Sequence, residues 1–175
     1  MLNIDSGSRR LYLQVGNGTL NSNSGPVNMV SLSVTVAQLG NGTALRMDSN
    51  SSQSNSPLDN YAVCNTSTEQ VYVGGSLRSP NNGGDSARLE VTSPSNLVNA
   101  AGDTIPINAI SWTSTANGNA NADIPAGTFS GGRQFLRTIL ANTYVENCLT
   151  FFYSNTALRG AGVYTGQVLY TLVTP

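Results

Sequence analysis

Two features of the sequence predict an all-β fold. Apolar residues alternate with polar ones in short runs, which is the pattern of a strand with one buried face. Asn, Ser, Thr and Gly supply 77 of the 175 residues, and many of them stand between those runs as turn residues. About nine or ten short strands separated by turns favour an antiparallel β-sandwich, immunoglobulin-like or jelly-roll, with long polar loops.

The expected strands follow one another along the chain. Residues 30–36 show the clearest alternation, with Val30, Leu32, Val34 and Val36 on one face and hydroxyl groups on the other. Residues 134–141 are the best helix candidate, but their pattern is equally compatible with a strand. Further strands are expected over residues 10–15, 70–73, 87–91, 104–107, 109–112, 145–153 and 163–173.

Turn residues connect these segments. Asn-Gly at 17–18 and at 41–42 supplies the positive φ of tight turns, and residues 48–60 and 117–123 are expected to form solvated loops. Asn117, Asn119, Asn121 and Asp123 occupy alternate positions as in a calcium loop, but the segment lacks the Gly at position six and the final Glu of an EF-hand, so we expect no metal there. No internal repeat or linker divides the chain. Residues 1–175 are therefore expected to form a single domain, which is long enough to bury a core.

The composition argues against an enzyme. The chain has no histidine and no lysine, which excludes His-based triads, an imidazole base, His-ligated zinc and Schiff-base chemistry. The nine carboxylates lie mostly in polar loops, and no spacing pairs two of them as a glycosidase requires. A net charge of −1 disfavours electrostatic binding to nucleic acid. We expect a non-enzymatic protein without a cofactor, a metal or a nucleic-acid partner.

The two cysteines and the amino terminus bear on the compartment. No apolar run reaches the roughly 18 residues of a membrane-spanning helix, and Met1 is not followed by the pattern of a signal peptide. Either the chain is a mature one whose signal has been removed, or it is cytosolic or viral; the polar, lysine-free composition favours a secreted or cell-surface protein. Cys64 and Cys148 form no CxxC motif, and each stands beside strand-type residues. We predict that they form a disulfide; the alternative is two buried free thiols.

The carboxyl-terminal segment carries a family resemblance. Residues 161–172, Ala-Gly-Val-Tyr-Thr-Gly-Gln-Val-Leu-Tyr-Thr-Leu, resemble the final strand of secreted bacterial pilus and fimbrial subunits of the chaperone–usher type. In this segment we expect Tyr164 to enter the sheet, with Val168, Tyr170 and Leu172 on one face. The resemblance implies an incomplete immunoglobulin-like sandwich, which a strand from a neighbouring subunit or a periplasmic chaperone completes by β-augmentation.

The same resemblance makes residues 1–15 the candidate donor strand. Its apolar contact residues are Leu2, Ile4, Leu11, Leu13 and Val15. The chain departs from the family in two ways: residues 7–10 interrupt the donor pattern, and the two cysteines link the middle of the chain to a late strand, whereas pilins commonly carry their disulfide in the amino-terminal half. A complete, self-sufficient sandwich therefore stays open as an alternative.

The leading hypothesis is a structural subunit or accessory component of a bacterial fimbria or adhesive filament. Its expected partners are other copies of itself, other pilus subunits or a periplasmic chaperone. One alternative is a carbohydrate-binding module in which Trp112 stacks on a sugar, although a single tryptophan in a strand more often belongs to the core. The other alternative is a viral capsid or tail component, for which free thiols at the two cysteines are expected.

Overall fold

A computed structural model of the protein describes residues 7–18, 27–65, 69–80, 84–116 and 122–175. Nearly all of the regular structure in these residues is strand, and the one helix is a short 3₁₀ turn. The elements are β1 (Arg10–Val15), β2 (Val30–Ser31), β3 (Leu45–Arg46), β4 (Asp48–Ser49), β5 (Gln70–Arg78), β6 (Ser86–Ser93), β7 (Asn96–Val98), β8 (Thr104–Pro106), η1 (Ile107–Ala109), β9 (Ile110–Ala116), β10 (Gly127–Thr128), β11 (Gly132–Leu140), β12 (Thr143–Tyr153) and β13 (Leu169–Val173). No helix in these ranges is long and apolar enough to cross a membrane.

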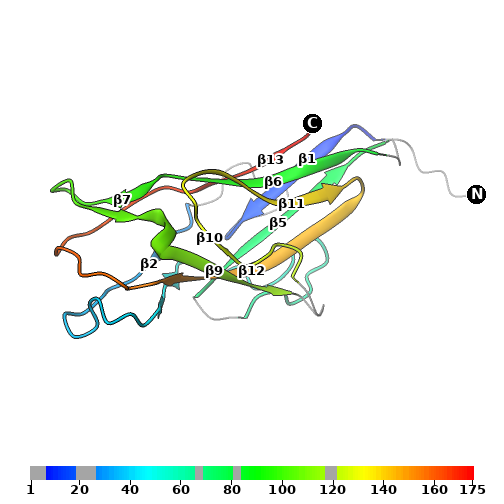
Figure 1. The fold of residues 1–175 in the computed structure, drawn as a ribbon. Coiled ribbons are helices and arrows are strands. Elements are labelled where there is room, and N and C mark those ends of the chain that lie inside the picture. Colours follow the sequence, from blue (N-terminus) through cyan, green and yellow to red (C-terminus); the bar gives the residue numbers. More distant parts are fainter. Residues whose placement is uncertain (1–6, 19–26, 66–68, 81–83, 117–121) are drawn as a thin grey trace, which may run out of the picture.

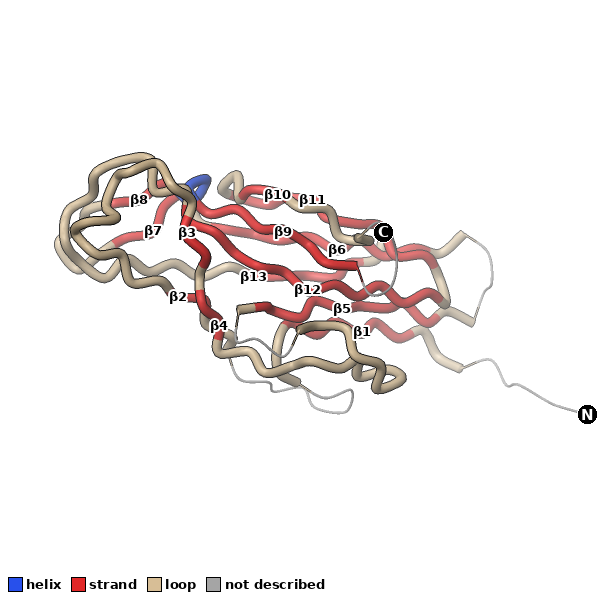
Figure 2. Tube along the Cα trace, turned by 90° about the horizontal axis from the view of Figure 1, so that it is seen from below, coloured by secondary structure: helices blue, strands red, loops and turns tan. Residues whose placement is uncertain are grey.

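The main strands form two antiparallel sheets that pack face to face (Figures 1 and 2). The larger sheet has the order β1-β5-β12-β9-β10, and β3 also pairs with β12. The smaller sheet has the order β11-β6-β13, and two short ribbons, β2–β4 and β7–β8, accompany the main sheets. The predicted all-β sandwich is therefore confirmed.

The core fills the space between the sheets because alternate residues of each strand point inward. Val73 of β5, Leu89 of β6 and Ile139 of β11 have no exposed surface. Burial of a side chain of this size contributes about 1.5–3 kcal/mol to the stability of the fold. Near β10, the rings of Trp112 and Phe129 pack with their centroids 4.8 Å apart.

Two buried asparagines hold connecting segments against the sandwich. The side-chain oxygen of Asn147 accepts a hydrogen bond from the Ile124 N–H at 2.8 Å, and its amide donates to the Thr115 carbonyl at 2.8 Å. Asn155 has a positive φ of 51°, a conformation that asparagine tolerates better than most residues, and its side-chain oxygen accepts from the Gly40 N–H at 2.9 Å. Asparagine side chains therefore fix connecting segments in place, in addition to forming turns.

The strand expected over residues 30–36 is wrong in its length. Strand pairing covers only Val30–Ser31, opposite β4. Leu32 still packs against the core, but Val36 is 93% exposed. Thr35 starts a turn in which the Gln38 N–H donates to its carbonyl at 3.0 Å and the Gln38 side-chain oxygen accepts from the Thr35 N–H at 3.1 Å. Such local bonds compete with strand pairing and end the alternating segment.

The segment that is compatible with either a helix or a strand is a strand. Residues 134–141 fall largely in β11, which pairs with β6 along its length. A β-bulge between Phe135 and Arg137 shifts the register, which explains why the apolar pattern of the segment is not strictly alternating. The strands expected over residues 70–73, 87–91 and 145–153 lie within β5, β6 and β12.

Candidate functional site

The strands β1 and β13 end the two sheets on the same side of the sandwich, where they contact each other (Figure 1). In the part of the chain that the structure describes, β1 pairs only with β5, and β13 pairs only with β6. Each strand therefore has an outer edge whose backbone groups face no partner strand within those residues. We call these two neighbouring edges the open seam.

The five predicted donor residues have different positions. Leu2 and Ile4 lie outside the described residues. Leu13 and Val15 of β1 pack against the core, whereas Leu11 is 45% exposed at the seam. Because β1 pairs with β5 of the same chain, residues 10–15 already occupy an edge position in their own sheet.

A side chain covers one end of the β1 edge. The Asn28 amide donates to the Val15 carbonyl at 2.5 Å, and the Asn28 side-chain oxygen accepts from the Asn17 N–H at 3.0 Å. Asn17 in turn accepts a hydrogen bond from the Ser52 N–H at 2.7 Å. These contacts close the carboxyl-terminal end of the β1 edge, and the seam is therefore open mainly beside the first residues of β1.

The carboxyl-terminal strand is shorter than expected. It begins only at Leu169, so it contains Tyr170 and Leu172, whereas Tyr164 and Val168 precede it. All four predicted residues nevertheless pack against the core. The Tyr164 hydroxyl donates to the Gly160 carbonyl at 3.0 Å, which stabilises a turn in place of a strand.

Trp112 belongs to the core. Its side chain is 4% exposed, its indole N–H donates to the Pro125 carbonyl at 2.9 Å, and its ring packs on Phe129. Gly127 lies so close that a Cβ there would be 2.7 Å from a ring carbon. A ring buried in this way presents no face to a sugar, so a stacking role for Trp112 has no support in the structure.

Cys64 and Cys148 form a disulfide with their Cα atoms 5.5 Å apart, as predicted. The bond lies against Tyr72, which is fully buried although it stands on the outer face of the larger sheet. The disulfide thus fastens the segment before β5 onto the centre of β12 and creates a second, small core.

A tyrosine cluster continues from this second core along the outer face. The hydroxyl groups of Tyr72 and Tyr144 are 2.6 Å apart, and the Tyr72 hydroxyl donates to Glu146 at 2.9 Å. The ring of Tyr12 stacks beside Tyr144 with centroids 6.2 Å apart. Burial raises the pKa of Tyr72 and of Tyr144 above the ordinary range, so both remain neutral donors. This arrangement stabilises the outer face of the larger sheet.

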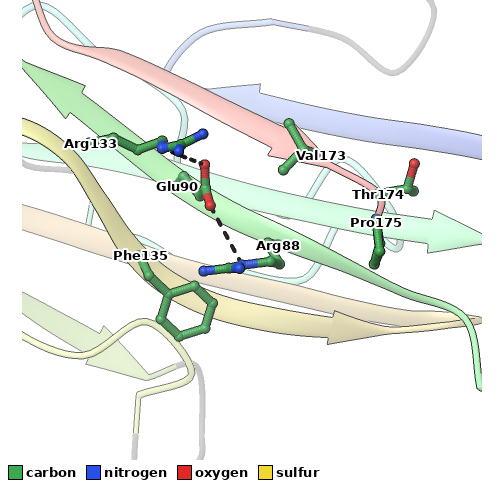
Figure 3. A pocket seen from close by; sticks show the side chains of 7 residues that line it. All are labelled: Arg88, Glu90, Arg133, Phe135, Val173, Thr174 and Pro175. Carbon is green, nitrogen blue, oxygen red and sulfur yellow. Dashed lines mark ion pairs between the residues drawn. The ribbon is translucent and has the colours of Figure 1, made fainter.

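A pocket of about 500 Å³ lies on the outer face of the smaller sheet (Figure 3). The Glu90 side chain, 8% exposed, forms its floor and lies between two arginines. The Nε atoms of Arg88 and Arg133 are 3.5 Å and 3.8 Å from its two carboxylate oxygens. The Arg88 guanidinium also lies over the Phe135 ring, 5.1 Å from its centroid. The remaining wall consists of Val173, Thr174 and Pro175.

These pocket residues were not identified from the sequence, although each strand carries a signal. Arg88 and Glu90 stand two residues apart in β6, and Arg133 and Phe135 stand two apart in β11, so each pair shares a face. Only the register between β6 and β11 brings the two pairs together, with Glu90 directly opposite Phe135. The spacing within each strand therefore predicts that two of these residues share a face, but it does not predict that the two pairs meet.

Of the polar segment 117–123, whose spacing imitates a calcium loop, the structure describes only Ala122 and Asp123. Asp123 forms an ion pair with Arg137 at 3.3 Å, while residues 117–121 lie outside the described residues. Within the described ranges, no three Cys, Asp or Glu side chains gather as a metal site would require.

The open seam and the pocket are thus the two features that could act on another molecule: one by backbone pairing and the other by charge and apolar contact. Comparison with protein-family models, with curated proteins and with solved structures finds no match to this chain.

Proposed function

We propose that this protein is a non-enzymatic structural subunit or accessory component of a bacterial fimbria or adhesive filament, located on the cell surface and assembled by strand pairing between copies. The observation that carries the proposal is the open seam, where β1 and β13 end both sheets side by side. Unpaired strand edges are ready templates for another strand, and natural proteins usually cover or interrupt them.

The pairing mode that fits these contacts is exchange of β1. In a single chain β1 pairs with β5 in an antiparallel register from Arg10 opposite Arg78 to Val15 opposite Val73. The same contacts form when β1 of one copy replaces β1 of the next, so the exchange requires no new interface chemistry. Within the described residues β1 pairs with β5 alone and its other edge belongs to the open seam, so β1 can leave its sheet without breaking a second set of strand hydrogen bonds.

The disulfide supports an extracellular place for such a subunit. Disulfides persist in oxidising compartments such as the periplasm and the cell surface, whereas free thiols are the state expected of the viral alternative. The long polar loops, poor in charge, suit a surface that faces solvent along a filament. These observations favour a surface filament over a capsid component.

Assembly in solution tests this function. Unreduced protein is examined by size-exclusion chromatography with light scattering over a range of concentrations, followed by electron microscopy of any large species. A synthetic peptide of residues 1–15 competes for the place on β5 that β1 of another copy would occupy, and a peptide with the same residues in scrambled order is the matched control. The proposal expects polymers from the native chain alone and with the scrambled peptide, and their shortening or loss with an excess of the peptide of residues 1–15. A strictly monomeric native chain overturns it.

A further inference from the structure

The pocket on the smaller sheet concentrates charge in a chain that has little of it. Only 17 of the 175 residues are charged (Lys+Arg 8, Asp+Glu 9), yet three of them, Arg88, Glu90 and Arg133, meet in this one hollow. Figure 3 shows Arg88 and Glu90 projecting from β6, and Arg133 and Phe135 projecting from β11 toward the same space. Two guanidinium groups and one side-chain carboxylate are thus brought together.

Glu90 does not engage all the hydrogen-bond donors of the two arginines. Both ion pairs run through Nε, at 3.5 Å and 3.8 Å, which is longer than the about 2.8 Å of a strong charged hydrogen bond. Within the described residues no other ion pair or hydrogen bond engages either guanidinium, so their terminal N–H groups are available to a ligand. Two N–H groups on one edge of a guanidinium can donate in parallel to the two oxygens of a carboxylate.

Apolar side chains lie beside the two guanidinium groups. Phe135 is 50% exposed and Val173 is 40% exposed, and both line the pocket. The Arg88 guanidinium covers Phe135 at 5.1 Å, which holds the arginine flat against the ring. The nearly buried Glu90 carboxylate lies within ion-pair distance of both arginines. Arg88, held by Glu90 and Phe135 together, is thus oriented before any ligand arrives, which lowers the entropic cost of binding.

We infer that this pocket binds a small carboxylate carried on an apolar ring, with the carboxylate between Arg88 and Arg133 and the ring against Phe135 and Val173. The volume of about 500 Å³ lies in the range of small-molecule sites, and the two guanidinium groups supply the donors that an anionic group requires. The inference does not rest on the proposed filament function, because the pocket faces outward from the smaller sheet and its ligand is measured on single chains.

Amide NMR titration of the isotope-labelled native chain tests the inference, with benzoate as the probe. Benzyl alcohol has the same ring without the charge, and acetate has the charge without the ring. We expect saturable shifts at Glu90, Arg133 and Phe135 with benzoate in the millimolar range, and binding at least about tenfold weaker for either comparison compound. Shifts that do not saturate, or that are equal for benzoate and benzyl alcohol, overturn the inference.

Two arginine variants make the test specific. Arg133→Gln removes one guanidinium group. The Arg133 side chain is 76% exposed, so the substitution should leave the fold intact. Benzoate should then bind about tenfold more weakly. Arg137→Gln is the matched control, because Arg137 lies on the same strand but pairs with Asp123 outside the pocket, and it should bind benzoate like the native chain. Equal affinity in the native chain and Arg133→Gln, or equal loss in both variants, contradicts the inference.

Discussion

Leu172 of β13 packs over Gly75 of β5, so that a Cβ at Gly75 would lie only 3.6 Å from the Leu172 methyl carbon. The same Cβ would be 3.1 Å from the Tyr12 carbonyl oxygen and 3.3 Å from the Ile139 side chain. The glycine therefore sets how closely the two sheets approach beside the seam, and no bulkier residue fits without movement.

This relationship predicts that Gly75→Val destabilises the fold. The added methyl groups must displace a backbone carbonyl and two core side chains, so the free energy of unfolding should fall by about 1–3 kcal/mol in denaturant titration. Arg78→Val, which places a branched side chain at an exposed position on the opposite face of the same strand, is the control and should stay within about 0.5 kcal/mol of the native chain. Equal losses in the two variants would mean that the close approach is unimportant.

Removal of the disulfide should be costly because it joins distant parts of the chain. The two cysteines are separated by 84 positions, and a loop of this length restricts the unfolded chain by about 4–5 kcal/mol. The double variant Cys64→Ala, Cys148→Ala should lose about that much stability, measured by urea unfolding. Native protein treated with a reductant supplies the comparison. A double variant as stable as the oxidised chain would contradict this account of the second core.

The stability of the protein should decline in alkaline solution. Burial raises the pKa of Tyr12, Tyr72, Tyr144 and Tyr170, so the folded chain keeps these protons where the unfolded chain releases them. Their contribution is fully present below about pH 10, the ordinary pKa of tyrosine, and is lost as the pH rises above it. Thermal unfolding followed between neutral pH and pH 11 checks this. A melting temperature that is unchanged across this interval would refute it.

The fluorescence of Trp112 should show that its indole ring is shielded from water. Its ring is buried between Phe129 and Gly127, so its fluorescence emission should be blue-shifted and poorly quenched by iodide. Because the chain has one tryptophan, the signal comes from this residue alone. Addition of a panel of sugars should leave the emission unchanged. Saturable quenching by a sugar would restore the carbohydrate-binding alternative.

Patterns among neighbouring residues were sufficient to predict several strands and the disulfide. Alternation located β5, β6 and β12, and the strand-like surroundings of the cysteines led to the disulfide pairing. Alternation failed over residues 30–36, where side-chain bonds of Gln38 start a turn. It could not foresee that Tyr72, on the outer face of its sheet, is buried, because the covering segment is brought there by a distant cysteine.

The candidate sites were less accessible to sequence reasoning. The sequence favours a core position for Trp112, as found, but leaves a sugar-stacking platform open because side-chain type does not reveal which face of a strand is covered. The seam depends on strand order, and the pocket depends on the register between β6 and β11. Both are set by contacts between residues far apart in the chain, for which a single sequence carries no direct signal.

Strand exchange between copies is tested most directly by mixed disulfide trapping. One batch carries Arg10→Cys and the other Arg78→Cys, two exposed positions that face each other between β1 and β5. The batches are mixed, allowed to assemble and oxidised. A second mixture of Arg88→Cys with Thr138→Cys, which face each other between β6 and β11, is the control.

The account predicts disulfide-linked dimers that contain one chain of each kind in the first mixture and none in the control, because only β1 leaves its own sheet. Opposed strand positions lie within the separation that a disulfide spans, so exchanged strands cannot escape detection. Absence of mixed dimers from the first mixture, or equal amounts in both, would contradict assembly by exchange of β1.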